Sequence, residues 1–265
     1  LSIDQLRNIS ESVTVPIEAF VHGALCVSYS GRCYVSQHIC GRSANRGACS
    51  QFCRLKFDLV DADGNVISTQ HHLSLRDMNR TNSIEQMLDA GVSSFKVEGR
   101  LKDVGYVRNI SAHYREQIDR VISRRPEFQR ASFGKSRYTF KPQVEKSFNR
   151  GFTEFFLQGR LPDIWSKRTP KAIGAPVGNV KRMGRRSFIV ESSVEFANGD
   201  GLCFFDNEGK LQGFRVNKAE GRELFPLKMP EGLLPGMELF RNEDRAFEKT
   251  MEKSFSERVL TVRLY

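Results

Sequence analysis

The sequence lacks the features that mark several large classes of protein. No apolar run approaches the roughly 18 residues needed to cross a bilayer, and the first residues do not follow the basic-then-apolar pattern of a secretory signal. Internal repeats and low-complexity tracts are also absent. We therefore expect a folded protein that resides in the cytoplasm and does not span a membrane.

The motifs of common hydrolases are missing too. The sequence contains neither the HExxH pair of zinc proteases nor the GxSxG turn that presents a nucleophilic serine. A peptidase built on this chain would have to use cysteine as its nucleophile. Because a thiolate that is bound to a metal is a poor nucleophile, a metal site at the cysteines would argue against that function.

Acidic residues are outnumbered by basic ones. The 265 residues include 41 Lys and Arg against 31 Asp and Glu, which gives a formal net charge of +10. A basic surface attracts polyanions such as RNA, because Lys and Arg neutralise phosphates and release counterions. The densest basic patches are Lys181–Arg182, Arg185–Arg186 and Arg124–Arg125. A basic surface with no such partner is the alternative.

Five of the six cysteines lie in one stretch, residues 18–54. Six residues separate Cys26 from Cys33, and three separate Cys49 from Cys53, with a loop rich in Gly, Ser, Asn and Arg between the pairs. Two closely spaced pairs with a flexible connector can bring four thiolates to one centre. This spacing is typical of a metal site.

Three interpretations of the cysteine pairs compete. Disulfides are not required in a chain long enough to bury a core, and no secretory segment is present. Structural zinc sites usually have two residues between paired cysteines, and neither pair has that spacing. An iron–sulfur cluster tolerates wider and uneven spacing, and nearby Gly and Ser can offer backbone N–H groups to the sulfurs. We favour the iron–sulfur cluster.

Other possible ligands have simpler interpretations. Cys40 is a fifth cysteine of the stretch and is expected to be a spare, although it could replace one of the four. Cys203 lies in an apolar run, which is typical of a small buried core residue. His71 and His72 are adjacent in an extended stretch, so their side chains point to opposite faces and do not form a metal pair.

The order of the expected elements favours an α/β part. Apolar residues at helical or strand spacing alternate along the first 125 residues, and charged residues directly follow two of the strands. Charged residues in that place are typical of a parallel (β/α) barrel, whose active site lies at the C-terminal ends of its strands. The expected helices are 1–12, 84–91 and 107–121, the strands are 15–21, 73–75 and 94–97, and a hairpin covers 55–70.

An all-β part is expected to follow. Residues 126–170 lose periodicity and turn basic and aromatic, which indicates a linker that packs on its neighbours. Residues 171–265 show short alternating runs between turns, which predict a small β-barrel domain that is cut at its C-terminal end. Its expected strands are 172–180, 187–191, 201–205, 213–217 and 237–240, followed by a surface helix at 242–253 and the beginning of a strand at 258–262.

Several blocks resemble the collagenase-like peptidase family U32. The most specific is EAFVHGALCVSYSGRCYVS at residues 18–36. Further blocks occur in family order: NRGAC at 45–49, CR at 53–54, SLRDM at 74–78, FKVEGRLK at 95–102 and NRGF at 149–152. The resemblance covers most of the chain and implies the closing part of a TIM-like (β/α)8 barrel. Both ends look cut, so we expect a fragment of a longer protein without its N-terminal part.

The resemblance also implies a function. Members of the family include iron–sulfur proteins that hydroxylate RNA bases with prephenate or take part in ubiquinone ring hydroxylation. It implies a [4Fe-4S] cluster on Cys26, Cys33, Cys49 and Cys53, and an RNA substrate with prephenate, a dicarboxylate, as the cosubstrate. The rRNA cytidine hydroxylase branch is the most similar, and tRNA uridine is the other possible target. A collagenase-type peptidase and a non-catalytic RNA-binding iron–sulfur scaffold are the alternatives.

Five charged or titratable residues near strands are candidates for the site. Glu18 lies in an apolar strand, where a carboxylate is costly unless it is paired or part of a site. Glu18, His22 and Glu98 are candidates for proton transfer. Arg76 and Arg100 are candidates for binding an anion, because a guanidinium pairs with carboxylate or phosphate through two hydrogen bonds. Ion pairs within the barrel are the structural alternative for the charged residues.

Overall fold

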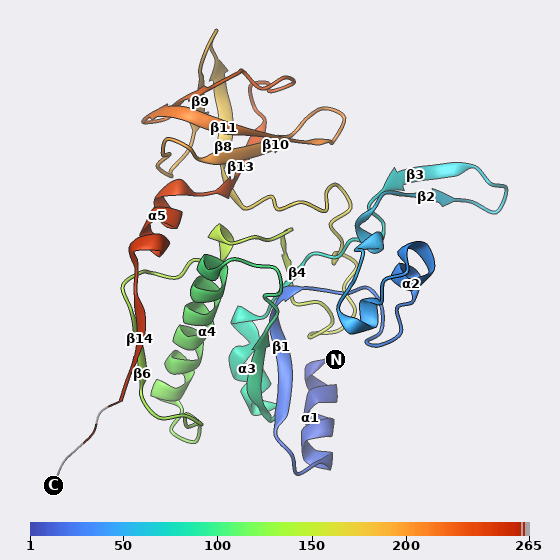
Figure 1. The fold of residues 1–265 in the computed structure, drawn as a ribbon, viewed down its shortest axis with the longest axis vertical. Coiled ribbons are helices and arrows are strands. Elements are labelled where there is room, and N and C mark those ends of the chain that lie inside the picture. The colour runs from blue at the N-terminus through green and yellow to red at the C-terminus, as the bar shows by residue number, and fades with distance from the viewer. Residues whose placement is uncertain (261, 263–265) are drawn as a thin grey trace.

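The computed structural model describes residues 1–260 and 262 (Figure 1). It contains the helices α1 (Ile3–Ser12), α2 (Val35–Cys40), α3 (Ile84–Asp89), α4 (Val104–Arg124) and α5 (Arg245–Lys253). Its strands are β1 (Ile17–Ala24), β2 (Phe57–Val60), β3 (Val66–Gln70), β4 (Asp77–Asn79), β5 (Val92–Val97), β6 (Lys135–Tyr138), β7 (Phe152–Thr153), β8 (Ala175–Met183), β9 (Phe188–Glu191), β10 (Gly201–Phe205), β11 (Leu211–Glu220), β12 (Glu223–Pro226), β13 (Glu238–Glu243) and β14 (Ser256–Val259).

A four-stranded sheet organises the first part of the chain, in the order β5-β1-β4-β7. Strand β1 runs parallel to β5 and antiparallel to β4, and β4 runs parallel to β7. The sheet is therefore mixed, whereas the sequence predicted a parallel one. In the described residues it stays open, so a TIM-like barrel remains a prediction.

One face of this sheet is covered by helices. Ala19 and Val21 of β1 are buried with residues of α1, α3 and α4, while Glu18 and Phe20 face solvent. Side chains that accept hydrogen bonds from the backbone fix the helix starts: Ser2 caps α1 in a capping box, and Asp103 caps α4. The three helices predicted in this part are confirmed, and α4 ends at Arg124, two residues before Pro126 as expected.

The sequence misplaced one strand of this sheet. The apolar residues at 73–75 predicted a strand there, but β4 begins at Asp77, and Leu75 forms only an isolated bridge with Trp165. Asp77 and Met78 are both buried in β4. Hydrophobic patterning does not identify a strand that contains a buried carboxylate. The residue that neutralises Asp77 is Arg150, which lies far along the chain.

The segment 126–170 is more structured than a linker. It contributes β7 to the mixed sheet, and its strand β6 pairs antiparallel with β14 near the C-terminus. Strand β14 begins two residues before the predicted 258–262. Thr261, within that prediction, lies outside the described residues.

The C-terminal part contains a closed six-stranded β-barrel, as the alternating runs predicted. Its strand order is β10-β11-β12-β9-β8-β13, and β12 is a strand that the sequence did not predict. The barrel has its own apolar core, separate from that of the mixed sheet, which includes Phe188, Phe204, Leu224 and Leu239. Helix α5, also predicted, follows the barrel and packs near α4.

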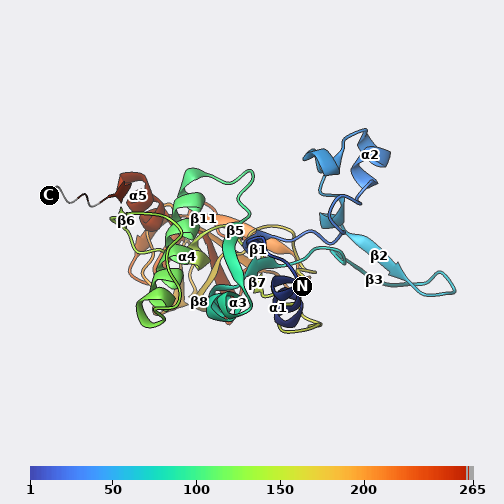
Figure 2. The same cartoon turned by 90° about the horizontal axis from the view of Figure 1, so that it is seen from below.

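The stretch from 25 to 70 projects from the rest of the molecule. Figures 1 and 2 both show α2 and the β2–β3 hairpin extending away from the mixed sheet. The total accessible surface is 16955 Å², well above the roughly 12,000 Å² expected for a compact monomer of this mass. The predicted hairpin is confirmed. No helix in the described part of the chain is long and apolar enough to span a membrane.

Candidate active site

His22 is buried at the end of β1. The pairing of β1 with β5 shifts register between Phe20 and His22, so Val21 and His22 are buried one after the other. The side chain is only 2% exposed, and its Nδ1 lies 3.2 Å from the Tyr114 hydroxyl. Burial and, to a smaller extent, the nearby His113 lower the pKa of His22 to about 4. His22 is therefore uncharged at neutral pH.

A buried ion pair lies where β4 meets β7. Nη1 of Arg150 donates to Asp77 Oδ1 at 2.9 Å, and the Arg150 backbone N–H donates to Oδ2 at 2.8 Å. Both side chains are almost fully excluded from solvent. Each carboxylate oxygen therefore has a donor, which offsets the desolvation of a buried charge.

Two further cations lie near this pair. Burial lowers the pKa of Arg54 and of Lys102, the charge of Arg150 lowers both further, and the charge of Asp77 raises both. We call Arg54, Lys102 and Arg150 the cation cluster. One buried carboxylate faces three cations, and Asp103 and Glu98 also lie near Lys102, so the cluster is a candidate site for an anion.

Aromatic rings line the cation cluster. The Lys102 ammonium lies 3.2 Å from the centroid of the Phe148 ring, and the Arg150 guanidinium carbon lies 4.8 Å from it. The Tyr106 hydroxyl donates to the Glu98 carbonyl at 3.2 Å, and burial, with smaller effects of Asp77 and Glu98, raises the Tyr106 pKa. Cation–π contact stabilises the charges of Lys102 and Arg150, which are poorly hydrated. Among the described residues, no carboxylate lies within ion-pair distance of Lys102.

Arg54 links the cation cluster to the cysteine segment, residues 25–54. Its Nη2 donates to the Leu25 carbonyl at 2.9 Å, and its Nη1 donates to the Leu75 carbonyl at 2.5 Å and to Ser74 Oγ at 2.8 Å. All three acceptors are neutral, so the guanidinium keeps its full charge. The two ends of the cysteine segment are thereby held against residues 74–75, which lead into β4.

The Cys53 thiol lies within electrostatic range of two other predicted ligands, Cys26 and Cys49. Burial raises the pKa of Cys53, Arg54 lowers it, and Cys26 and Cys49 raise it further, whereas Cys33 is not among the groups that affect it. None of the six cysteines forms a disulfide in this structure.

The sequence around these thiols suits an anionic metal centre. Residues 19–57 contain five cations and no Asp or Glu, so no carboxylate there competes with a cluster whose thiolates carry negative charge. In the described structure, however, no group of three or more His, Cys, Asp or Glu side chains is close enough to hold a metal ion. The donor chemistry fits a cluster, but the sulfur positions are not those of a closed site.

The predicted proton-transfer residues do not all come together. Glu18 is half-exposed and pairs with Lys96 at 3.3 Å, on the solvent side of β1 and away from His22. Glu98 lies beside His22: its backbone N–H donates to the His22 carbonyl at 2.8 Å, and its carboxylate accepts from the Arg100 backbone at 2.9 Å. Thus Glu98 and His22 are neighbours, and Glu18 is separate.

The predicted anion-binding arginines lie outside the cation cluster. Arg76 pairs with the exposed Asp163 at 2.9 Å. Arg100 is exposed, and its guanidinium lies so close to Gly47 in the cysteine segment that a Cβ there would come within 2.7 Å of it. Gly47 has φ +87, a conformation that favours glycine. Arg100 therefore lies against the cysteine segment, without a carboxylate partner among the described residues.

The remaining two cysteines and the adjacent His71 and His72 make local contacts. Cys203 is completely buried in β10, and burial raises its pKa to about 11. The Cys40 thiol donates to the Ser36 carbonyl at 3.1 Å. His71 Nδ1 lies 2.8 Å from the Arg54 carbonyl, and His72 Nε2 lies 3.2 Å from Ser68 Oγ.

Sequence reasoning missed the cation cluster itself. Arg54 directly follows a cysteine, and Lys102 and Arg150 lie in blocks that were noted only for their resemblance. From the sequence alone, basic residues in polar loops are expected to face solvent. Only the long-range pairing of β4 with β7 brings Arg150 to Asp77. The sole signal in the sequence was their occurrence inside those blocks.

The family follows from a comparison with known proteins. The model of Peptidase family U32 matches residues 1–167, which include the cysteine segment and the cation cluster. The chain belongs to peptidase family U32. No solved structure matches it significantly.

Relatives in this family have two kinds of name. A 23S rRNA 5-hydroxycytidine synthase of Escherichia coli is 43% identical over 99% of this chain and 41% of its own length. A collagenase of Porphyromonas gingivalis is 32% identical over 83% of this chain and 56% of its own length. A tRNA hydroxylation protein of Bacillus subtilis is 39% identical over 43% of this chain and 29% of its own length. The chain thus spans less than two-thirds of the length of these relatives.

Proposed function

We propose that this U32 chain is part of a cytoplasmic iron–sulfur enzyme that hydroxylates a pyrimidine base in RNA. Cytidine in rRNA is the favoured substrate, and the relatives that bear the names of rRNA and tRNA hydroxylation proteins support the reaction class. One observation carries the proposal: Arg54 belongs to the cation cluster and also holds both ends of the cysteine segment. This contact couples a site suited to anions with a site suited to a redox cluster.

The cysteine segment would hold the cofactor. Cys26, Cys33, Cys49 and Cys53 supply the thiolates for a [4Fe-4S] cluster, which provides one-electron redox chemistry when bound. Cys53 lies within electrostatic range of Cys26 and Cys49, and Cys33 stands in a loop with Gly31, whose φ is +74 and which faces open space. Binding requires Cys33 to approach the other three.

The cation cluster would receive a small dicarboxylate such as prephenate. Lys102 has no ion-pair partner among the described residues, and Arg100 lies exposed at the edge of the cysteine segment. Carboxylates replace part of the hydration that burial removes from Lys102 and Arg54. Arg76 is a weaker candidate for this role, because Asp163 already pairs with it.

Glu98 and His22 are the better placed groups for proton transfer. His22 is buried and uncharged at neutral pH, and Glu98 follows it across the β1–β5 pairing. Glu18 faces solvent beside Lys96 and is better explained by that ion pair. In this arrangement the chain's own residues bind the anion, orient it and exclude water, while Glu98 and His22 hold or move a proton.

A collagenase-type peptidase is the second candidate, since the relatives include collagenases. A cysteine peptidase requires a histidine that hydrogen-bonds its thiol. Among the described residues no histidine forms such a bond with a cysteine, and His22 is directed to Tyr114. The geometry therefore favours hydroxylation over peptide cleavage.

A scaffold that binds RNA without catalysis would leave the cation cluster without a substrate.

Anaerobic reconstitution tests the proposal. The complete protein, loaded with iron and sulfide, is incubated with RNA from a strain that lacks its gene, with and without prephenate. We expect one pyrimidine nucleoside to gain an oxygen atom only when prephenate is present, as measured by mass spectrometry of digested RNA. Unmodified RNA together with cleavage of collagen peptides by the iron-free protein would favour the peptidase instead.

A further inference from the structure

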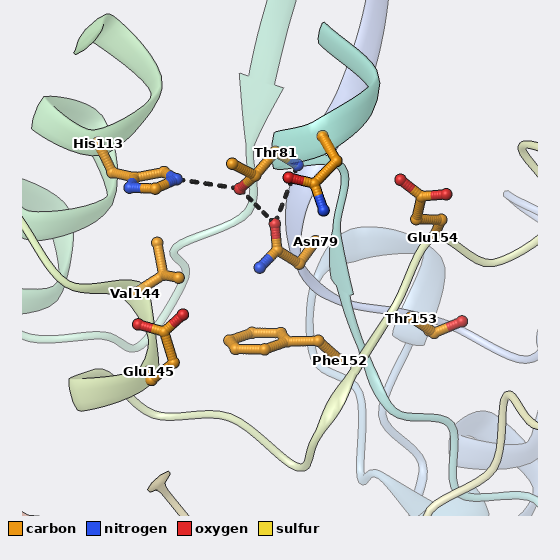
Figure 3. Close-up of a pocket in the computed structure, with 9 residues that line it drawn as sticks. Asn79, Thr81, His113, Val144, Glu145, Phe152, Thr153 and Glu154 are labelled. Carbon is orange, nitrogen blue, oxygen red and sulfur yellow. Dashed lines mark hydrogen bonds between the residues drawn. The ribbon is translucent and has the colours of Figure 1, made fainter. Parts of the chain in front are cut away.

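A pocket opens between α4, β4 and β7 (Figure 3). Its volume is about 320 Å³, large enough for a nucleobase. The Phe152 ring, which lines it, packs 5.7 Å from the buried His22 ring. The lining residues are Asn79, Thr81, Asn82, His113, Val144, Glu145, Phe152, Thr153 and Glu154.

The Asn79 amide has a fixed orientation. Its Oδ1 accepts from the Thr81 backbone N–H at 3.0 Å and from the Thr81 hydroxyl at 2.5 Å. A backbone N–H can only donate, so the oxygen must face Thr81 and the amide nitrogen must face the other way. Figure 3 shows this nitrogen on the side of Val144 and Phe152. No described residue accepts a hydrogen bond from it, so it presents a free donor to the pocket.

A free acceptor stands beside this donor. No hydrogen bond or ion pair joins the Glu145 carboxylate to another described residue, and its charge raises the pKa of His113, which burial lowers. His113 is itself held, because the Thr81 hydroxyl gives its only proton to Asn79 and must accept from His113 Nε2–H at 3.0 Å. Glu154 is also engaged, accepting from the Ser83 hydroxyl at 2.6 Å. Glu145 is thus the carboxylate available to a ligand.

We propose that this pocket binds an unpaired cytosine base of the RNA, with Phe152 stacking on the ring, Asn79 donating to N3 and Glu145 accepting from the N4 amine. This inference rests on the proposed function. Cytosine presents an acceptor, N3, next to a donor, the N4 amine, and this edge complements a side-chain donor next to a carboxylate. Uracil presents the reverse, a donor at N3 next to an acceptor at O4. Adenine shares this edge chemistry, and the smaller pyrimidine ring matches the proposed reaction.

The assignment is consistent with how enzymes reach a base. Chemistry on a nucleobase requires it to leave the stack, and the extruded base is read by its Watson–Crick edge and held by aromatic side chains. Contacts to N3 and N4 leave the C5–C6 edge of cytosine, which the proposed hydroxylation changes, free of Asn79 and Glu145. These two residues are therefore assigned to substrate specificity.

Binding without turnover tests the proposal. The complete protein is titrated, at one fixed salt concentration and without prephenate, with single-stranded RNAs that differ only in a central cytosine, uracil, adenine or abasic site. We expect cytosine RNA to bind about tenfold more tightly than uracil RNA, in line with one good base-edge contact. Equal affinity for uracil would overturn the proposal, and equal or tighter binding of adenine would overturn the assignment to cytosine.

Three variants locate the effect. Glu145→Gln should reduce the cytosine-over-uracil preference to less than about twofold, because the amide can offer either a donor or an acceptor. Phe152→Leu should weaken binding of both RNAs and leave their ratio unchanged. The control, Glu11→Gln on exposed α1, makes the same change of charge and should leave both affinities unchanged. A preference that survives Glu145→Gln in a folded protein would overturn the proposal.

The failure of this inference is distinguishable from failure of the proposed function. If RNA from the gene-deletion strain loses a hydroxylated cytidine but Glu145→Gln keeps wild-type discrimination, only the pocket assignment is wrong. If the nucleosides are unchanged while the cytosine preference depends on Glu145, the pocket assignment stands and the proposed reaction fails.

Discussion

Arg150 binds both oxygens of Asp77, one through its side chain and one through its own backbone N–H. The two residues belong to segments far apart in the sequence, and their contact coincides with the pairing of β4 and β7. The pair therefore fixes the edge of the mixed sheet and at the same time sets the balance of charge in the cation cluster. The contact between Asp77 and Arg150 therefore affects both the stability of the sheet and the charge of the cation cluster.

Removing Asp77 should destabilise the protein strongly. Asp77→Ala leaves Arg150 buried without its carboxylate, and breaking a buried pair in this way costs about 3–5 kcal/mol. Asp163→Ala, which removes the exposed partner of Arg76, should cost less than about 1 kcal/mol. Urea denaturation of the two variants measures the difference. Similar small losses for both would show that the Asp77 pair is not the anchor of this edge.

Acid should destabilise the protein through His22. Its folded pKa is about 4, below the ordinary 6.5, so between these values the unfolded state binds more protons. The contribution is fully present above pH 6.5 and is lost as the pH falls to about 4, by about 3 kcal/mol. We expect His22→Gln to lose less stability than wild type over this interval. Parallel curves of unfolding free energy against pH would contradict it.

Gly23 should not tolerate a side chain. Its φ is +111, and a Cβ would lie 2.4 Å from the Glu98 carbonyl oxygen. Gly23→Ala should therefore cost about 2–4 kcal/mol through strain and the displacement of β5 from β1. Gly64 in the β2–β3 turn also has a positive φ, +86, but faces open space, so Gly64→Ala should cost only about 1 kcal/mol. Thermal unfolding compares them.

Each proposed ligand should be necessary for the cluster. After anaerobic purification, Cys26→Ala, Cys33→Ala, Cys49→Ala and Cys53→Ala should each lose most of the iron and acid-labile sulfide. Cys203→Ala and Cys40→Ala should keep both, because one thiol is buried in the β-barrel and the other is bonded to Ser36. Loss of iron in Cys40→Ala would mean that the ligand set is different, and colourless wild-type protein with one equivalent of zinc would exclude the iron–sulfur cluster.

Local patterns in the sequence predicted much of the fold. The helical spacing of apolar residues located α4, because Ile110, Tyr114 and Val121 all face one core. Short alternating runs between turns predicted the β-barrel for a similar reason, since each inward residue enters a single core. Both signals depend only on residues that are near in sequence.

Features that depend on distant residues were not predictable. The antiparallel pairing of β1 with β4 and the burial of Asp77 require partners that no local pattern identifies. The pocket donor on Asn79 depends on which way its amide is turned by Thr81. The sequence located the cysteine pairs and His22, but the Arg54 side chain that connects them to the charged site became visible only in three dimensions.

The most direct test of the account is a nucleoside survey of cells that lack the gene for the complete protein. The rRNA and tRNA are digested and every nucleoside is quantified by mass spectrometry. We expect one hydroxylated pyrimidine, a hydroxycytidine of rRNA, to disappear and to be restored by the wild-type gene but not by Cys33→Ala. An unchanged set of nucleosides, or restoration by Cys33→Ala at the wild-type level, would contradict it.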